Sequence, residues 1–138
     1  MITCTFAGHA HVYESQVESR ARAALDALLK LDEEFCFLSG GMGGFDRLCE
    51  GLVREAKKLH PQKRIQLLLV LPYMTQALKI HRKYYDERYD QVILPAELDG
   101  HRHRSAIPRR NRWMVDQSKY MVSYVWDTTG RIQRLPVS

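Results

Sequence analysis

Four glycines within five residues form the most unusual stretch of this 138-residue chain. The stretch reads SGGMGGFD, at residues 39–46, and lies between an apolar run and an amphipathic segment. A glycine-rich turn from a strand into a helix exposes backbone N–H groups at the positive end of the helix dipole, where phosphate groups bind readily. The turn therefore predicts a phosphate site, although a structural turn that needs left-handed backbone angles is the alternative. The spacing matches neither GxGxxG nor GxxxxGK[ST].

Two carboxylates follow the glycines at a spacing that places them on one face of a helix. Asp46 and Glu50 are four residues apart, and such pairs are neighbours on a helix surface. A carboxylate beside a phosphate site can hold ribose hydroxyls or a divalent cation that accompanies the nucleotide, and it can act as a catalytic acid or base. The structural alternatives are that Asp46 caps the helix and that Glu50 pairs with Arg47 or Arg54 on the helix surface.

A basic segment lies later in the chain. The letters HRHRSAIPRRNRWMVDQS contain five arginines and two histidines before the first acid. Such a segment could neutralise nucleic-acid phosphates, with Trp113 stacking on a base. Helical spacing instead favours Arg109 and Arg112, with Asp116 one turn further on, as side chains aimed into a cleft where each could contact a phosphate. Arg110 is expected to be a solvated surface residue.

The apolar patterns that must position these residues alternate between strand and helix. Residues 65–71 form a near-continuous apolar run, interrupted by Gln66 alone, which is typical of a central parallel strand buried on both faces. The alternation implies an α/β fold with three α/β/α layers and a mainly parallel sheet of about five strands. Strands are expected at 2–6, 35–38, 65–71, 91–94 and 120–126, helices at 14–31, 45–59, 75–89 and 108–118, and a loop at 96–107.

Ligands of such sheets bind outside the carboxyl ends of the strands. Gly8 and His9 follow the first expected strand, and Pro72 and Tyr73, which could pack on a base or sugar, follow the third. No metal site is expected, because the HxH pairs have no partner cluster. The expected ligand-binding residues are Gly8, His9, Ser39, Gly40, Gly41, Gly43, Gly44, Phe45, Asp46, Pro72, Tyr73, Arg109, Asn111 and Arg112, and the candidate catalytic residues are Asp46 and Glu50.

The composition favours a single globular domain over residues 1–138, since 45% of the residues are hydrophobic. A net charge of +5 favours anionic partners. No apolar run approaches the roughly 18 residues that span a membrane, and the N-terminus lacks the pattern of a signal peptide. Three cysteines without a close pair are expected to be free thiols in a reducing, cytoplasmic setting.

Four segments occur in the order TFAGHAHVY, FLSGGMGGFDRLCEGLVREA, IQLLLVLPY and RRNRWMVDQSKYMVSYVWD. They resemble the SLOG superfamily of Rossmann-like nucleotide-binding domains, which contains the Lonely-guy proteins and DNA-processing protein A, and within it the branch of small YspA/YpsA-like proteins. The resemblance covers about residues 2–127. It implies a Rossmann-like domain, acting as a sensor or binding domain, that takes a nucleotide or nucleotide-derived ligand at the carboxyl ends of its strands.

The C-terminal part departs from that pattern. Hydrolases of the superfamily carry a second glycine turn, PGGxGTxxE, whereas this chain reads VWDTTGRIQRLPVS, with Gly130 alone and no glutamate after it. The closing helix of the fold is expected to be absent or reduced, and His9 is followed by alanine where this branch often shows arginine. We therefore expect binding without Lonely-guy-type catalysis. A hydrolase that cleaves an N-glycosidic or phosphate bond and a single-stranded nucleic-acid binder are the alternatives, and a homo-oligomer is compatible with each.

Overall fold

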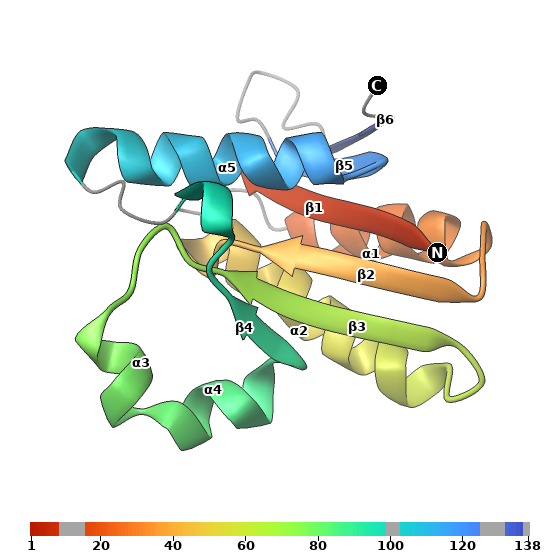
Figure 1. The fold of residues 1–138 in the computed structure, drawn as a ribbon. Coiled ribbons are helices and arrows are strands. Elements are labelled where there is room, and N and C mark those ends of the chain that lie inside the picture. The colour runs from red at the N-terminus through yellow and green to blue at the C-terminus, as the bar shows by residue number, and fades with distance from the viewer. Residues whose placement is uncertain (9–15, 99–102, 125–131, 137–138) are drawn as a thin grey trace.

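The computed structural model describes residues 1–8, 16–98, 103–124 and 132–136. These residues form a six-stranded sheet in the order β4-β3-β2-β1-β5-β6 (Figure 1). Its first five strands run parallel, whereas β6 pairs antiparallel with β5. The mainly parallel sheet predicted from the sequence is confirmed. The strands are β1 (Ile2–Gly8), β2 (Glu34–Ser39), β3 (Arg64–Val70), β4 (Gln91–Ile93), β5 (Tyr120–Tyr124) and β6 (Ile132–Pro136).

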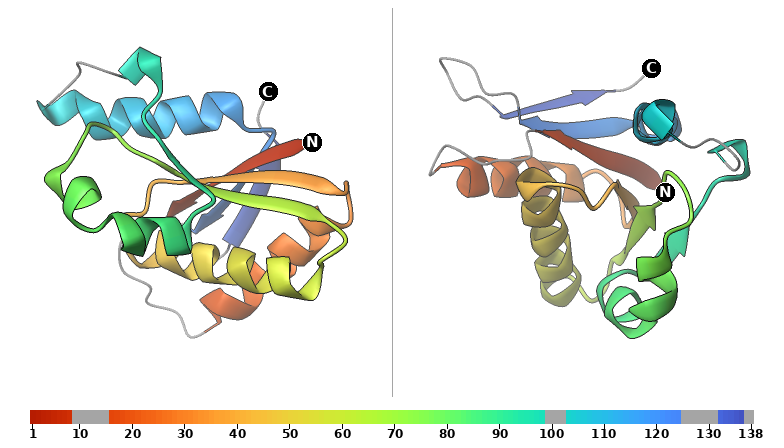
Figure 2. Two further views of the ribbon diagram at one scale, coloured as in Figure 1. Left: turned by 60° about the horizontal axis from the view of Figure 1, so that its bottom comes forward. Right: turned by 90° about the vertical axis from the view of Figure 1, so that its left-hand side faces the viewer.

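Helices cover both faces of this sheet, so the predicted three-layer architecture is also confirmed. Helices α1 and α2 pack on one face and α5 on the other, as Figure 2 shows from two directions. None of the described helices is long and apolar enough to cross a membrane. The helices are α1 (Val17–Leu29), α2 (Gly44–Leu59), α3 (Gln76–Ile80), α4 (Arg82–Arg88) and α5 (Ala106–Gln117), with short 3₁₀ turns at Ala96–Leu98 and His103–Ser105.

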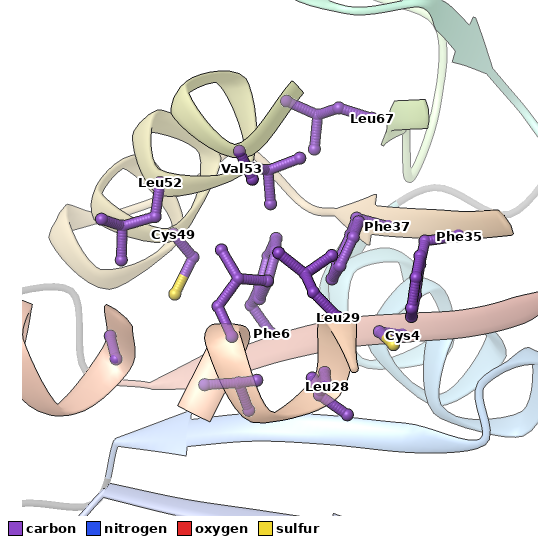
Figure 3. Close-up of a cluster of buried hydrophobic side chains, with 14 of the residues drawn as sticks. Cys4, Phe6, Leu28, Leu29, Phe35, Phe37, Cys49, Leu52, Val53 and Leu67 are labelled. Atoms are coloured by element: carbon purple, nitrogen blue, oxygen red, sulfur yellow. The ribbon is translucent and has the colours of Figure 1, made fainter. Parts of the chain in front are cut away.

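Aromatic rings pack with leucine, valine and cysteine side chains in the core beneath α1 and α2 (Figure 3). The ring of Phe37 stacks against Phe6 at 5.9 Å and against Phe35 at 6.0 Å between ring centroids. Alternate residues of a strand point to the same face, which brings these rings together with Leu28 of α1 and Val53 of α2. Each fully buried side chain of this size contributes about 1.5–3 kcal/mol of hydrophobic stabilisation.

The intervening residues of β2 and β3 form a second cluster under α5. Leu38, Leu68 and Val70 pack there against Met114, with Trp113 at the edge. Both central strands are therefore buried on both faces, as the near-continuous apolar run at 65–71 predicted. This packing holds α5 above the carboxyl ends of β2 and β3.

Three elements differ from the sequence prediction. The helix expected at 75–89 is broken at His81, whose φ of −112° and ψ of 37° lie outside the helical region. The two short helices α3 and α4 that result stand away from the sheet (Figure 1). The last two residues of the loop expected at 96–107 already belong to α5. Residues 132–136, which carried no prediction, form β6 in place of a closing helix.

Candidate functional site

The glycine turn connects β2, which ends at Ser39, to α2, which begins at Gly44. Gly41 has a φ of 66° and Gly43 a φ of 91°. Side chains with a Cβ are strained in this left-handed region. Two of the four glycines are therefore required by the path of the backbone, as the structural alternative predicted.

Gly40 is required for a different reason, which is the position of Arg110. Arg110 is only 2% exposed, and its Nη1 donates hydrogen bonds to the carbonyl oxygens of Gly40 (3.1 Å) and Val70 (3.0 Å). A Cβ at Gly40 would lie 2.8 Å from the guanidinium carbon of this side chain. The expectation that Arg110 is a solvated surface arginine is wrong: α5 turns this arginine into the protein and leaves Arg109 and Arg112 exposed.

Glu50 is buried at 3% exposure beneath the turn. Its carboxylate accepts hydrogen bonds from the Ser39 hydroxyl, from the Tyr89 hydroxyl at 2.8 Å and from Arg54 at 3.4 Å. Ser39 Oγ in turn accepts the N–H of Gly41 at 3.1 Å. The predicted pairing with Arg54 is present, but as part of a buried network rather than on the helix surface. This network ties α2 and the residue after α4 to the glycine turn.

Asp46 is partly buried in the first turn of α2. Its Oδ2 accepts the N–H of Met42 at 3.1 Å, so it braces the glycine turn, whereas the helix cap that the structural alternative predicted is not formed at the N-cap residue Gly43. The pKa of Asp46 is raised to about 6, chiefly because burial disfavours its charged form. The hydrogen bond from the Met42 N–H and the positive charge of Arg110 lower this pKa, whereas the negative charge of Glu50 raises it further. A carboxyl group that titrates this close to neutral pH can gain or lose a proton under ordinary conditions.

A pocket of about 240 Å³, here called the inner pocket, lies at the carboxyl end of β1 between the first turn of α2 and α5. Among the described residues, Gly8, Asp46 and Asn111 line it, and Arg110 lies at its wall. The sheet order places β2, β3 and β4 on one side of β1 and β5 on the other. The inner pocket therefore lies at the topological switch point, where ligands of open α/β sheets bind.

A second pocket of about 470 Å³, here called the outer groove, lies on the other side of the turn, between α2 and the α3–α4 pair. Gly40, Gly41 and Met42 form its rim, and Met42 also borders the inner pocket. Its other lining residues include three arginines, Arg47, Arg54 and Arg88, and four tyrosines, Tyr73, Tyr84, Tyr85 and Tyr89.

The structure thus divides the expected ligand-binding residues into separate groups. Gly8, Asp46 and Asn111 border the inner pocket, and Gly40, Gly41, Pro72 and Tyr73 border the outer groove. Ser39 and Phe45 are fully buried. Gly43, Gly44, Arg109 and Arg112 line neither pocket. His9 lies outside the described residues.

Sequence reasoning missed several residues of the outer groove. The prediction of one continuous helix at 75–89 does not indicate that Tyr84, Tyr85, Arg88 and Tyr89 line a pocket. The available signal was three tyrosines and one arginine within six residues, which is unusual for a solvated helix face.

Phe45 was expected to contact a ligand, but its ring packs 5.7 Å from that of Tyr124 and leaves no room for a Cβ at Gly8.

Within the described residues, no three His, Cys, Asp or Glu side chains gather in a way that could hold a metal ion. No protein-family model matches the chain, and no curated protein matches it either.

Proposed function

We propose that the protein binds a nucleotide or a nucleotide-derived small molecule in the inner pocket, as a sensor or binding domain of the SLOG type. The observation that carries this proposal is the position of the pocket at the carboxyl end of β1, the strand about which the sheet order reverses. The resemblance of four sequence segments to SLOG domains supports the same ligand class.

The side chains around the inner pocket suit a sugar phosphate. The first turn of α2 begins at Gly44, and no described side chain caps it at Gly43. Its backbone N–H groups can therefore donate hydrogen bonds to a phosphate, with favourable orientation of the helix dipole. The positive charge of Arg110 behind the turn adds to this attraction. Asp46 and Asn111 offer the carboxylate and amide groups that pair with ribose hydroxyls.

The size of the pocket limits which part of the ligand it encloses. Pockets for whole drug-sized ligands measure about 300–1,000 Å³, and the inner pocket has about 240 Å³. It can enclose the phosphate and sugar of a nucleotide, with the base directed toward the rim. Recognition of the base then depends on residues at that rim.

A second candidate function is hydrolysis of an N-glycosidic or phosphate bond of the nucleotide. The pKa of Asp46, raised to about 6, favours this candidate because a general acid or base works best when its pKa is near the working pH. Glu50 is less suited to such a role, since Ser39, Tyr89 and Arg54 all bond to its carboxylate.

The experiment is thermal unfolding of the protein in the presence of nucleoside monophosphates, nucleoside diphosphates, nucleotide sugars and dinucleotides. A ligand that binds the native state raises the midpoint by mass action. Ile107→Trp should abolish the shift, because Ile107 is 37% exposed and borders the inner pocket, which a tryptophan would fill. Ile80→Trp is the matched control, because Ile80 is 70% exposed on α3 and lies in neither pocket.

An unchanged ligand shift in Ile107→Trp would contradict binding in the inner pocket, and the absence of a shift with every nucleotide would contradict the ligand class. Ligands that give a shift are then incubated with the protein and their products are separated by chromatography. Turnover that disappears in Asp46→Asn while binding persists would favour the hydrolase, and binding without turnover would favour the sensor.

A further inference from the structure

The outer groove lies between α2 and the α3–α4 segment, whose Leu78 and Tyr85 pack against the end of β3. The groove is floored by Leu69, Leu71 and Pro72 of the β3 end and bounded by α2 on one side and α4 on the other. Its volume of about 470 Å³ falls within the range of small-molecule sites. All of its lining residues belong to the described part of the chain.

The groove is positively charged where it meets solvent. Arg47 and Arg88 are exposed at its sides, and the side chain of Arg47 has no bonding partner within the described residues. Glu50 is the sole acidic residue that lines the groove. Its carboxylate is turned inward and already accepts bonds from Ser39, Tyr89 and Arg54, so it offers no opposing charge at the mouth. This arrangement attracts an anion.

The groove also presents preformed aromatic surfaces. The guanidinium carbon of Arg88 lies 3.7 Å from the ring centroid of Tyr84, and the rings of Tyr85 and Tyr89 stack at 6.4 Å. Tyr89 is further fixed by its hydrogen bond to Glu50. Tyrosines held in this way offer flat contact area with little loss of side-chain entropy when a ligand binds.

We propose that the outer groove binds a small molecule made of an aromatic ring and one anionic group, a phosphate or a carboxylate. The ring lies on the leucine floor among the tyrosines, and the anion lies between Arg47 and Arg88. The two arginines come from α2 and α4, so binding joins the two walls of the groove. This site is separate from the inner pocket and does not depend on the proposed nucleotide function.

The test uses anilinonaphthalene sulfonate, a fluorescent aromatic anion, in a titration of the full chain. Saturable binding is expected, and Arg88→Ala and Arg47→Ala should each weaken it by about tenfold, which is typical for loss of a charge-assisted contact. The matched control is Arg82→Ala. Arg82 is exposed on the same helix and lies outside the groove, so its loss should leave the affinity unchanged. The midpoint of thermal unfolding shows whether each variant is folded.

Competition then separates the two parts of the ligand. Phenyl phosphate should displace the probe at concentrations about tenfold lower than either inorganic phosphate or phenol, since only phenyl phosphate carries both groups. Ile107→Trp, which fills the inner pocket, should leave this displacement unchanged and so separates this site from the nucleotide site. Absence of saturable binding, an equal loss in Arg82→Ala, or equal displacement by inorganic phosphate and phenyl phosphate would each overturn the proposal.

Discussion

The guanidinium carbon of Arg110 lies 2.8 Å from the point that a Cβ on Gly40 would occupy. The buried side chain of Arg110 in α5 therefore fits against the backbone after β2 because Gly40 has no Cβ. Gly40→Ala should destabilise the protein by about 1–3 kcal/mol, because the added methyl group overpacks a site held by hydrogen bonds. Gly51 of α2 is the control: a Cβ there meets open space, so Gly51→Ala should stabilise the helix by about 0.5–1 kcal/mol. Urea unfolding of both variants measures the difference, and equal stabilities would contradict it.

Removal of the arginine itself should have a larger effect. Arg110→Met leaves the buried carbonyl oxygens of Gly40 and Val70 without their donor, and we expect a loss of about 2–4 kcal/mol in the free energy of unfolding. Arg109→Met changes an exposed neighbour on the same helix and should stay within about 0.5 kcal/mol of the wild type. If urea unfolding showed a larger loss of stability for Arg109→Met than for Arg110→Met, the assignment of Arg110 as the inward arginine would be wrong.

Asp46 should make stability depend on pH around neutrality. Burial raises its pKa from 3.8 to about 6, so between these values the folded protein binds more protons at this site than the unfolded chain does. The resulting stabilisation is fully present below pH 4 and is lost as the pH rises through about 6. Asp46→Asn keeps an oxygen for the Met42 N–H and removes the buried charge. The difference between the unfolding midpoint of Asp46→Asn and that of the wild type should therefore increase in favour of the variant as the pH is raised from 5 to 8.

The control for this pH dependence is Asp26→Asn, which changes an exposed aspartate of α1. Its midpoint relative to the wild type should be constant over the same pH range. A constant difference for Asp46→Asn as well would show that the carboxyl group of Asp46 is not perturbed by burial.

The hydroxyl of Tyr89 should contribute to stability through Glu50. Tyr89→Phe removes a donor at 2.8 Å from a buried carboxylate, and bonds to charged groups contribute about 1.5–3 kcal/mol. Tyr84→Phe is the control, because Tyr84 is 50% exposed and its hydroxyl makes no hydrogen bond within the described residues. Guanidinium unfolding should separate the two variants by at least about 1 kcal/mol, and a smaller difference would mean that the buried network tolerates the loss.

Much of the fold could be predicted because burial imposes a clear period on the sequence. The near-continuous apolar run at 65–71 and the helical spacing at 45–59 correspond to β3 and α2, since each is buried as its pattern requires. The break at His81 was not predicted because α4 buries no residue, so no apolar period shows where one helix ends and the next begins. Strand β6 was missed because the short segment at 132–136 mixes polar and apolar residues.

The site was harder to predict than the fold, because side-chain direction depends on the rotation of each helix about its axis. The sequence predicted a helix at 108–118 with Arg109 and Arg112 facing inward, whereas the inward arginine is Arg110. Likewise the glycine turn was recognised, whereas its division of the carboxyl edge into two pockets follows from where α5 and α4 pack. The nucleotide ligand itself stays a prediction.

The antiparallel pairing of β6 with β5 determines how copies of the chain could join. An unpaired edge strand offers its N–H and C=O groups to another chain, and natural sheets protect such edges by keeping them short or covering them. At one edge β6 covers β5 along all five of its residues, and at the other β4 has only three. Growth of the described sheet across two molecules would therefore have to start from the five residues of β6 or the three residues of β4.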